Sequence, residues 1–398
     1  MPSRRHVLAR FAAAAALSPL GPLARLSLAA PGPRSGNARF VFVILRGGMD
    51  GLTAVPAVGD PAFAAARGDL GRFDAFGSGP LPLDGTFALH PLLTRLHAMY
   101  GQSELAVLHA TGQAYRERSH FDGQQVLESG GTKPYQINDG WLGRALAGAG
   151  AQPLRGVALD TAVPLVLRGP REVDTWAPSF LPDPSDDLVA RLEAMYRGDP
   201  DLSRALARAR GLHEMPGMAA NDAAGGHARA MTALAAKAAE FLQRESQVAV
   251  LDMTGWDSHV GQAAPQGPTS NSLRTLDAAL GTLRDGLQAG GTWSRTVVIV
   301  ATEFGRTVAI NGTQGTDHGS GGVALVLGGA VRGGRVLADW PGLAPAQRYQ
   351  GRDLRTTTDL RSALRTVLAE HLRLAPAFID QTVLPGSAGL PRLDLLRA

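Results

Sequence analysis

Five apolar runs of strand length, each joined to a cluster of acids, histidines or serines with glycines, constrain this chain most. Four clusters follow such a run, at 46–51, 118–122, 255–259 and 302–307, and the fifth, at 316–322, precedes one. In an open parallel α/β sheet, ligands bind in the crevice outside the carboxyl ends of the strands. We therefore predict that clusters far apart in the sequence meet at one sheet edge and form an active site.

The apolar runs predict a mainly parallel sheet flanked by helices. They span 40–45, 105–109, 248–251, 296–301 and 323–327. The first run is continuous, which is typical of a strand buried on both faces. Helical spacing of leucines appears between the runs, which indicates an α/β class.

One section, about 183–245, differs in character from the rest. It is alanine-rich and charged, and Pro216, Gly217, Gly225 and Gly226 interrupt its helical patterns. We predict a helical insertion here, within a single α/β domain that spans 40–398.

The excess positive charge lies at the N-terminus. Residues 1–29 carry four arginines and no acids, which accounts for the formal net charge of +4 of the whole chain. Basic runs interleaved with aromatic residues do not occur elsewhere, so the sequence gives nucleic-acid binding little support.

Those arginines fit an export leader. Ser3-Arg4-Arg5-His6-Val7-Leu8 resembles the twin-arginine signature, and an apolar stretch at 11–17 follows it. A spanning helix needs roughly 20 apolar residues, and Pro and Gly interrupt this run, so we favour a cleaved leader over a membrane anchor. We predict a signal peptide at 1–29, a linker at 30–39, passage through the twin-arginine translocase, a periplasmic or secreted location and no stable membrane span.

The chain has no cysteine. Thiolate zinc sites, iron–sulfur clusters, disulfides and cysteine nucleophiles are therefore excluded. Any metal must be held by carboxylate, imidazole, hydroxyl or carbonyl groups.

Three clusters carry candidate metal ligands. Asp50, at the end of the first run, suits a divalent cation and equally a helix N-cap. Asp257 and His259 stand two residues apart, so in an extended segment both side chains point the same way. Asp317 and His318 add a second acid–imidazole pair.

The other two clusters carry a further candidate metal ligand and the candidate catalytic groups. Glu303 follows the run at 296–301 as a further metal ligand, and Arg306 can pair with it or hold an anionic group. Ser119 can act as a nucleophile at a helix N-terminus or only as an N-cap. Arg118 is a candidate partner for a developing oxyanion.

These motifs together carry a family resemblance. They are RGGMDGL at 46–52, SHFD at 119–122, GWDSH at 255–259, TEFGR at 302–306 and DHG at 317–319. They resemble a family of uncharacterised exported proteins, the domain of unknown function numbered fifteen hundred and one, grouped with the alkaline phosphatase and sulfatase superfamily. The resemblance implies an alkaline-phosphatase-like three-layer sandwich, a divalent metal pair and a Ser or Thr nucleophile that attacks a phosphate or sulfate ester.

By position, the resemblance assigns Asp50 to the first metal acid, Ser119 to the nucleophile, Asp257 and His259 to a metal pair and His318 to the late histidine. Two departures stand out. Active members commonly space the middle Asp and His more widely, and they place Asp-His where this chain has Glu303-Phe304. These departures imply that one metal site is altered or lost. The lack of cysteine also speaks against a formylglycine-dependent sulfatase.

The sequence thus predicts an exported metal-dependent hydrolase of anionic phosphate or sulfate esters, either small molecules or polysaccharides. Its cofactor would be a divalent metal (Zn, Mn, Mg or Ca), and Ser119, Arg118 and Arg306 would be its catalytic groups. Two alternatives remain: an exported binding or assembly protein that has lost catalysis on the same fold, and a metal-independent serine hydrolase.

Overall fold

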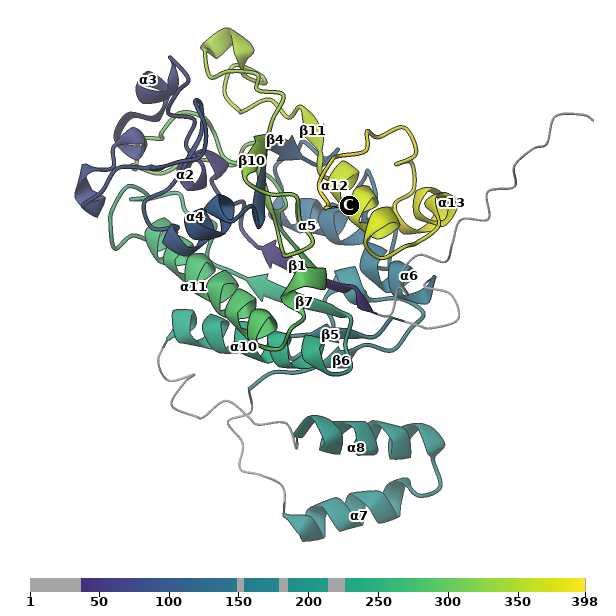
Figure 1. Cartoon of the computed structure of the whole chain (residues 1–398). Coiled ribbons are helices and arrows are strands. Elements are labelled where there is room, and N and C mark those ends of the chain that lie inside the picture. Colours follow the sequence, from purple (N-terminus) through teal and green to yellow (C-terminus); the bar gives the residue numbers. More distant parts are fainter. Residues whose placement is uncertain (1–36, 149–153, 179–184, 214–225, 398) are drawn as a thin grey trace, which may run out of the picture. The chain divides into compact units, whose positions relative to one another are not determined.

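The structure is a computed structural model that describes residues 37–148, 154–178, 185–213 and 226–397 (Figure 1). The predicted leader and most of the linker lie outside the described residues. Residues from Ser35 onward form one compact unit.

A nine-stranded sheet forms the centre of this unit, in the order β10-β4-β9-β8-β1-β7-β5-β6, with β11 beside β4. Its strands are β1 (Arg39–Leu45), β4 (Leu105–Gly112), β5 (Gly156–Ala158), β6 (Asp174–Thr175), β7 (Val248–Met253), β8 (Thr296–Thr302), β9 (Gly322–Leu327), β10 (Arg335–Leu337) and β11 (Thr358–Asp359). Strand β9 runs antiparallel to both of its neighbours, and every other pairing in the sheet is parallel. A small hairpin of β2 (Leu81–Pro82) and β3 (Ala88–Leu89) stands apart.

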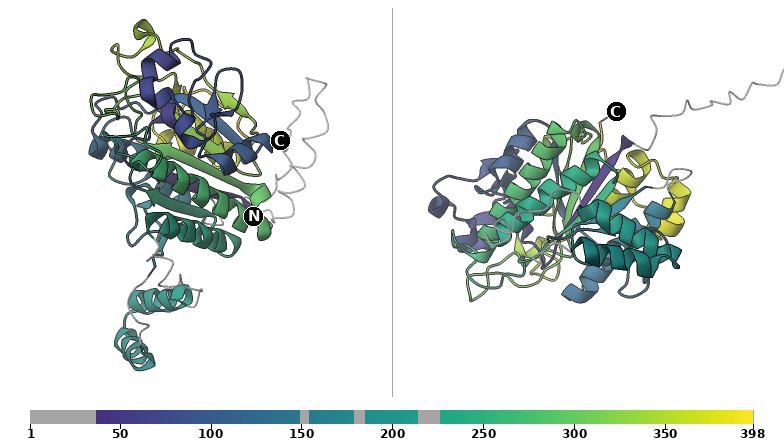
Figure 2. Two further views of the ribbon diagram at one scale, coloured as in Figure 1. Left: turned by 90° about the vertical axis from the view of Figure 1, so that its left-hand side faces the viewer. Right: turned by 90° about the horizontal axis from the view of Figure 1, so that it is seen from below.

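Helices cover both faces of the sheet (Figures 1 and 2). The α-helices of the described residues are α2 (Gly51–Ala54), α3 (Phe63–Arg67), α4 (Thr94–Gly101), α5 (His120–Ser129), α6 (Trp141–Ala147), α7 (Asp186–Tyr196), α8 (Pro200–His213), α10 (His227–Gln243), α11 (Pro268–Ala289), α12 (Leu360–Glu370) and α13 (Pro376–Phe378). The predicted fold class, a mainly parallel sheet between helical layers, is confirmed.

Strand β1 shows why the sheet is buried on both faces. Val41, Val43 and Leu45 belong to the core cluster that also holds α4, α10 and α11. The alternating side chains of β1 belong to the second cluster, with α5, α6 and α12. Because successive side chains in a strand point to opposite faces, only a continuous apolar run can serve both cores. Each fully buried side chain of this kind contributes roughly 1.5–3 kcal/mol.

The predicted helical insertion divides into two parts. Helices α7 and α8 contact each other, and α7 has no buried residue. Helix α10 instead buries Met231, Ala235 and Phe241 and packs on α11 and β7, so it belongs to a helical layer of the sandwich.

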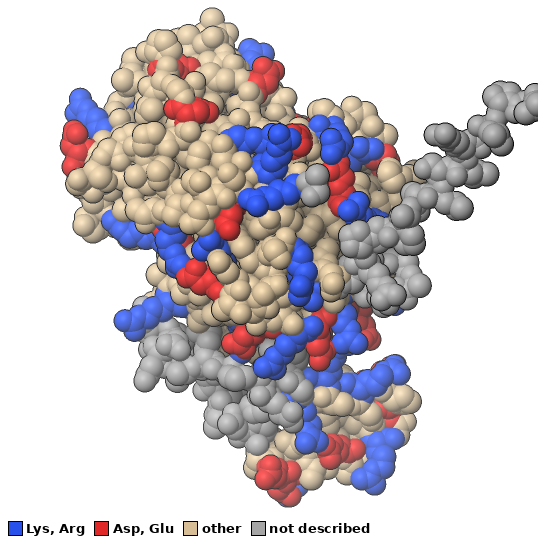
Figure 3. All heavy atoms as spheres, viewed as in Figure 1, with Lys and Arg blue, Asp and Glu red and all other residues tan. Residues whose placement is uncertain are grey.

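The described residues contain no helix with the length and apolar character needed to cross a membrane. Acidic and basic side chains are interspersed over the face drawn in Figure 3.

Candidate metal centre

The strands that carry the polar clusters end at one edge of the sheet. Leu45 pairs with both Met253 and Thr302, so β1, β7 and β8 end level with one another. Strand β4 runs in the same direction, because β9 lies antiparallel between β4 and β8. The reversed β9 therefore begins at the edge where the others end, and all five clusters lie there, as the sequence predicted.

A glycine lets two of these clusters approach closely. Gly47 has φ 119°, and a Cβ atom there would lie 2.4 Å from the backbone nitrogen of Asp257. Its own N–H donates to Oε1 of Glu303 at 2.9 Å. No larger residue fits this position, so the loop after β1 holds the loops after β7 and β8 together.

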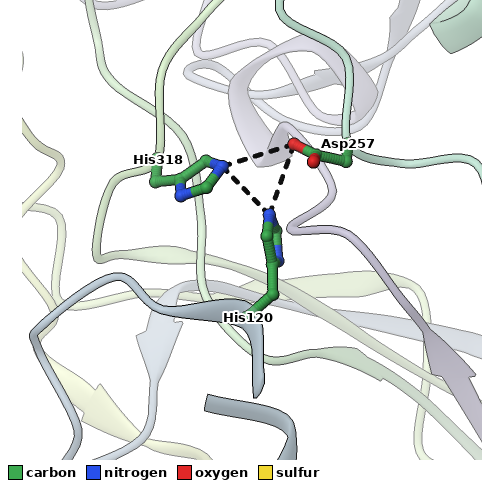
Figure 4. A group of neighbouring side chains, drawn as sticks. All are labelled: His120, Asp257 and His318. Atoms are coloured by element: carbon green, nitrogen blue, oxygen red, sulfur yellow. Dashed lines mark hydrogen bonds and ion pairs between the residues drawn. The ribbon is translucent and has the colours of Figure 1, made fainter. Parts of the chain in front are cut away.

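Three side chains from different elements converge at this edge (Figure 4). His120 is the first residue of α5, Asp257 lies in the loop after β7, and His318 lies in the loop before β9. Nε2 of His120 is 3.0 Å from Nε2 of His318, and Oδ1 of Asp257 is 3.3 Å from each of them.

His259 joins this group from the same loop as Asp257. Its Nε2 lies 3.1 Å from Nε2 of His318 and 3.0 Å from Oδ1 of Asp257. The group is open to solvent on one side, because the side chains of His259 and Asp257 are 40% and 48% exposed.

An acceptor stands behind each imidazole ring. Nδ1 of His120 is 2.6 Å from Oε1 of Glu303, and Nδ1 of His318 is 2.9 Å from the backbone oxygen of Arg118. Nδ1 of His259 is 3.4 Å from Oδ1 of Asp317. A backbone carbonyl can only accept, so His318 carries its hydrogen on Nδ1. The same assignment for His120 leaves the Nε2 lone pair of both neutral rings facing the group.

This donor set fits a small divalent cation. Two imidazole lone pairs and a carboxylate oxygen within 3.0–3.3 Å of one another repel unless a positive charge lies among them. Zinc bonds of about 2.0–2.1 Å in a tetrahedron place neighbouring ligand atoms roughly 3.3 Å apart. Imidazole with carboxylate suits zinc or manganese better than calcium.

The charges around the group keep its acid ionised. Burial would raise the pKa of Asp257, but the hydrogen bond and charge of Arg306 hold it well below the usual range. Burial lowers the pKa of His120, yet the hydrogen bond and charge of Glu303 and the charge of Asp257 outweigh it, so the net shift is upward. The pKa of His318 is lowered, by burial first and then by the charges of His120 and Arg306.

Asp50 does not join the group. Its carboxylate caps α2 by accepting from the N–H groups of Leu52 and Thr53, and Oδ2 pairs with Arg67 at 2.5 Å. Gln262 donates a further bond at 3.4 Å. Of the two roles that the sequence left open, the geometry favours the N-cap.

Glu303 and Asp317, predicted as direct ligands, lie one layer further back. Glu303 is fully buried and accepts from Gly47, Gln124 and Thr302 as well as facing His120. Burial raises its pKa, but the bonds from His120 and its other donors outweigh this and lower it. Asp317 faces His259 and accepts from Asn311.

Arg306, predicted to pair with Glu303 or to hold a substrate anion, has a different acidic partner. Its side chain is 1% exposed and pairs with Asp257 at 2.7 Å. It also donates to the backbone oxygens of Gly47, Gly48 and Trp256. The guanidinium therefore joins three loops, and its Nη1 lies 3.4 Å from Nε2 of His259.

Arg118 and Ser119 stand at the start of α5. Arg118 pairs with the buried Asp353, with Nη2 2.8 Å from Oδ2. Ser119 is the N-cap of α5, and its Oγ accepts from the N–H of Asp122 at a long 3.5 Å.

His120 is the candidate ligand that sequence reasoning missed. It appeared only as the neighbour of Ser119, although its own position at a strand-end cluster was the available signal. The direction of its ring depends on where α5 begins, and the spacing of residues in the sequence does not give that direction.

Comparison with known proteins identifies a family and no curated relative. A family model described as a protein of unknown function (DUF1501) matches residues 82–374. No curated protein sequence matches the chain.

Solved structures with similar folds have low identity. The crystal structure of Ps i-CgsB in complex with k-i-k-neocarrahexaose has 11% identity and TM-score 0.42, over 85% of this chain and 72% of that one. The phosphonate monoester hydrolase of Agrobacterium radiobacter has 13% identity and TM-score 0.39, over 85% and 74%. The PsFucS1 sulfatase from Pseudoalteromonas sp. has 14% identity and TM-score 0.41, over 90% and 74%.

Proposed function

The chain belongs to the DUF1501 family of unknown function, so its activity has to be inferred from the site, and we propose that it is an exported metal-dependent hydrolase of phosphate or sulfate esters. One observation carries the proposal: His120, Asp257 and His318 direct acceptor atoms at a common point.

Four side chains would hold the metal: His120, Asp257, His259 and His318. A divalent cation bound there would supply Lewis acidity toward an ester oxygen and lower the pKa of a coordinated hydroxyl. Glu303, Asp317 and the carbonyl of Arg118 would orient the rings, since such outer partners fix the tautomer of ligating histidines.

Ser119 is the proposed nucleophile. It directly precedes His120 and caps the ten-residue α5, whose N-terminus favours a developing anion. Its Oγ makes a long capping bond to Asp122 and also hydrogen-bonds the hydroxyl of Tyr115. Attack by Oγ on the phosphorus or sulfur would transfer the group to the serine and release the alcohol, and water would then hydrolyse the new ester.

We keep residues 1–29 in the proposal as a twin-arginine signal peptide. A metal ligated by residues from 120 to 318 requires the folded domain, and the twin-arginine translocase carries proteins already folded. Loading before export is consistent with that route.

The test is metal analysis of protein purified after export, without chelators or a metal-binding tag. We expect near-stoichiometric zinc, manganese or another divalent ion in the wild type and its loss in His120→Ala. His227→Ala serves as the matched control, because His227 is an exposed histidine at the start of α10. Aryl phosphates, phosphodiesters and aryl sulfates then serve as substrates, with activity removed by EDTA and restored by metal.

If the wild-type protein is folded but contains no metal, the proposal is refuted. Esterase activity insensitive to EDTA would instead indicate a metal-independent serine hydrolase.

One observation favours the second candidate, an exported binding or assembly protein without catalysis. Both predicted catalytic arginines are engaged, Arg306 with Asp257 and Arg118 with Asp353. Stoichiometric metal with silence across the whole ester panel would support this reading.

A further inference from the structure

Asp353 is a buried acid that no motif of the sequence indicates. It lies between β10 and β11, and its side chain is fully inaccessible to solvent. Its Oδ2 accepts from Nε of Arg118 at 2.9 Å and from Oγ of Ser320 at 2.8 Å. Its Oδ1 makes a 3.3 Å ion-pair contact with Nε of Arg352.

Two of these three partners, Arg118 and Arg352, also contact His318. The backbone oxygen of Arg118 accepts from Nδ1 of His318 at 2.9 Å. Nη2 of Arg352 donates to the backbone oxygen of His318 at 2.9 Å. Ser320 stands two residues further along the same loop.

The backbone conformation of Arg118 is one that needs support from its surroundings. Arg118 has φ 64°, the left-handed region that a residue with a Cβ seldom adopts. Such a conformation persists only where the surroundings hold it. The pair with Asp353 holds it here, and the left-handed turn aims the carbonyl at the ring of His318.

We propose that Asp353 is a positioning residue for the metal centre: through Arg118 it fixes the Nδ1–H tautomer of His318, so that Nε2 faces His120 and Asp257. This inference rests on the proposed metal site. It assigns Asp353 no contact with substrate.

The test compares Asp353→Asn with Asp380→Asn. Asp380 is a matched control, because it also accepts from an arginine through two bonds and from a serine, with Arg365 and Ser387 as its partners. Two readouts apply: zinc and cobalt affinity by chelator competition, with the visible absorption of the Co²⁺ protein, and the ring-nitrogen NMR shifts of His318 without metal.

We expect Asp353→Asn to lower metal affinity 10–100-fold, the range typical of outer-sphere substitutions, and to alter the Co²⁺ spectrum. His318 should change from one tautomer to a mixture, and Asp380→Asn should match the wild type in both readouts. Adding Arg118→Gly to Asp353→Asn should recover affinity, because glycine adopts a positive φ without support.

Unchanged affinity and an unchanged tautomer in Asp353→Asn, or equal losses in Asp380→Asn, would overturn the inference. Wild-type protein that binds no zinc or cobalt would refute the proposed function. The NMR measurement on metal-free protein would then still decide whether Asp353 sets the tautomer.

Discussion

Nδ1 of His120 and Oε1 of Glu303 lie 2.6 Å apart, with the glutamate fully buried behind the ring. The ring therefore presents Nε2 to Asp257 and His318, while the carboxylate keeps Nδ1 as the donor. A carboxylate, a histidine and a metal in line is an arrangement that orients the ligand and raises its basicity.

Glu303→Gln should weaken metal binding without removing a ligand. The amide oxygen still accepts from His120, but the negative charge behind the ring is lost, so we expect zinc affinity to fall about 10–100-fold. Competition with a chromophoric chelator measures this, and Glu370→Gln, in a partly exposed pair with Arg392, is the control. Equal affinities in wild type and Glu303→Gln would contradict the orienting role.

Asp50→Asn should lower stability and leave the metal in place. Its pair with Arg67 is buried, with side-chain exposures of 2% and 0%, and removing one partner leaves an uncompensated charge. We expect the free energy of unfolding to fall by about 3–5 kcal/mol, measured in urea. Asp69→Asn, in an exposed pair with Arg72, should change it by less than about 1 kcal/mol. If Asp50→Asn instead loses the metal with an unchanged free energy of unfolding, Asp50 is a metal ligand after all.

Ser119→Ala separates the nucleophile from the helix cap. If Ser119 attacks the ester, turnover disappears while metal content stays, and lost capping costs roughly 1 kcal/mol. Ser185→Ala removes the equivalent cap of α7, where Oγ accepts from Leu188 at 3.3 Å, and should leave turnover intact. Full activity in Ser119→Ala would make water the attacking group.

Two buried histidines should make stability depend on pH. Burial lowers the pKa of His109 and, together with the charge of Arg274, that of His90, each to about 4. Between pH 4 and 6.5 the unfolded chain binds more protons, so stability is fully present above pH 6.5 and is lost as pH falls toward 4. Each shift is worth on the order of 3 kcal/mol.

Urea unfolding with EDTA at several pH values between 4.5 and 7 checks this. Asp252, whose pKa burial raises to about 6, contributes with the opposite sign, so the comparison with His109→Gln isolates the histidine. A slope unchanged by His109→Gln would show that His109 does not titrate as expected.

The convergence of the clusters could be predicted from the sequence, because strand direction alone brings their ends to one edge. On that basis the sequence predicted that Asp257, His259 and His318 lie near one another, and they do. The sequence did not show how far each side chain lies from the centre of the site. Glu303 and Asp317 are acids, as a metal ligand can be, yet they lie behind the rings of His120 and His259. Whether an acid at a strand end reaches the centre depends on side-chain direction, which spacing does not encode.

Pairings with distant residues were also beyond the sequence. Asp50 follows β1 and meets Arg67 at the end of α3, and no pattern links the two positions. Asp353 meets Arg118 across 235 positions, in a loop without a recognisable motif. Such contacts appear only when the whole chain is folded.

The reversed direction of β9 has a consequence for how relatives can diverge. The segment between β8 and β9 leaves and re-enters the sheet at the same edge, with Glu303 and Arg306 near its start and His318 near its end. The bridge between Arg306 and His318 closes its base. The tip at 309–315 also contacts the site, because Asn311 donates to the backbone oxygen of His259 at 3.1 Å and to Oδ1 of Asp317 at 3.2 Å, and Thr313 donates to the same backbone oxygen at 2.7 Å. A relative with a longer or shorter tip would therefore keep the base but hold His259 differently.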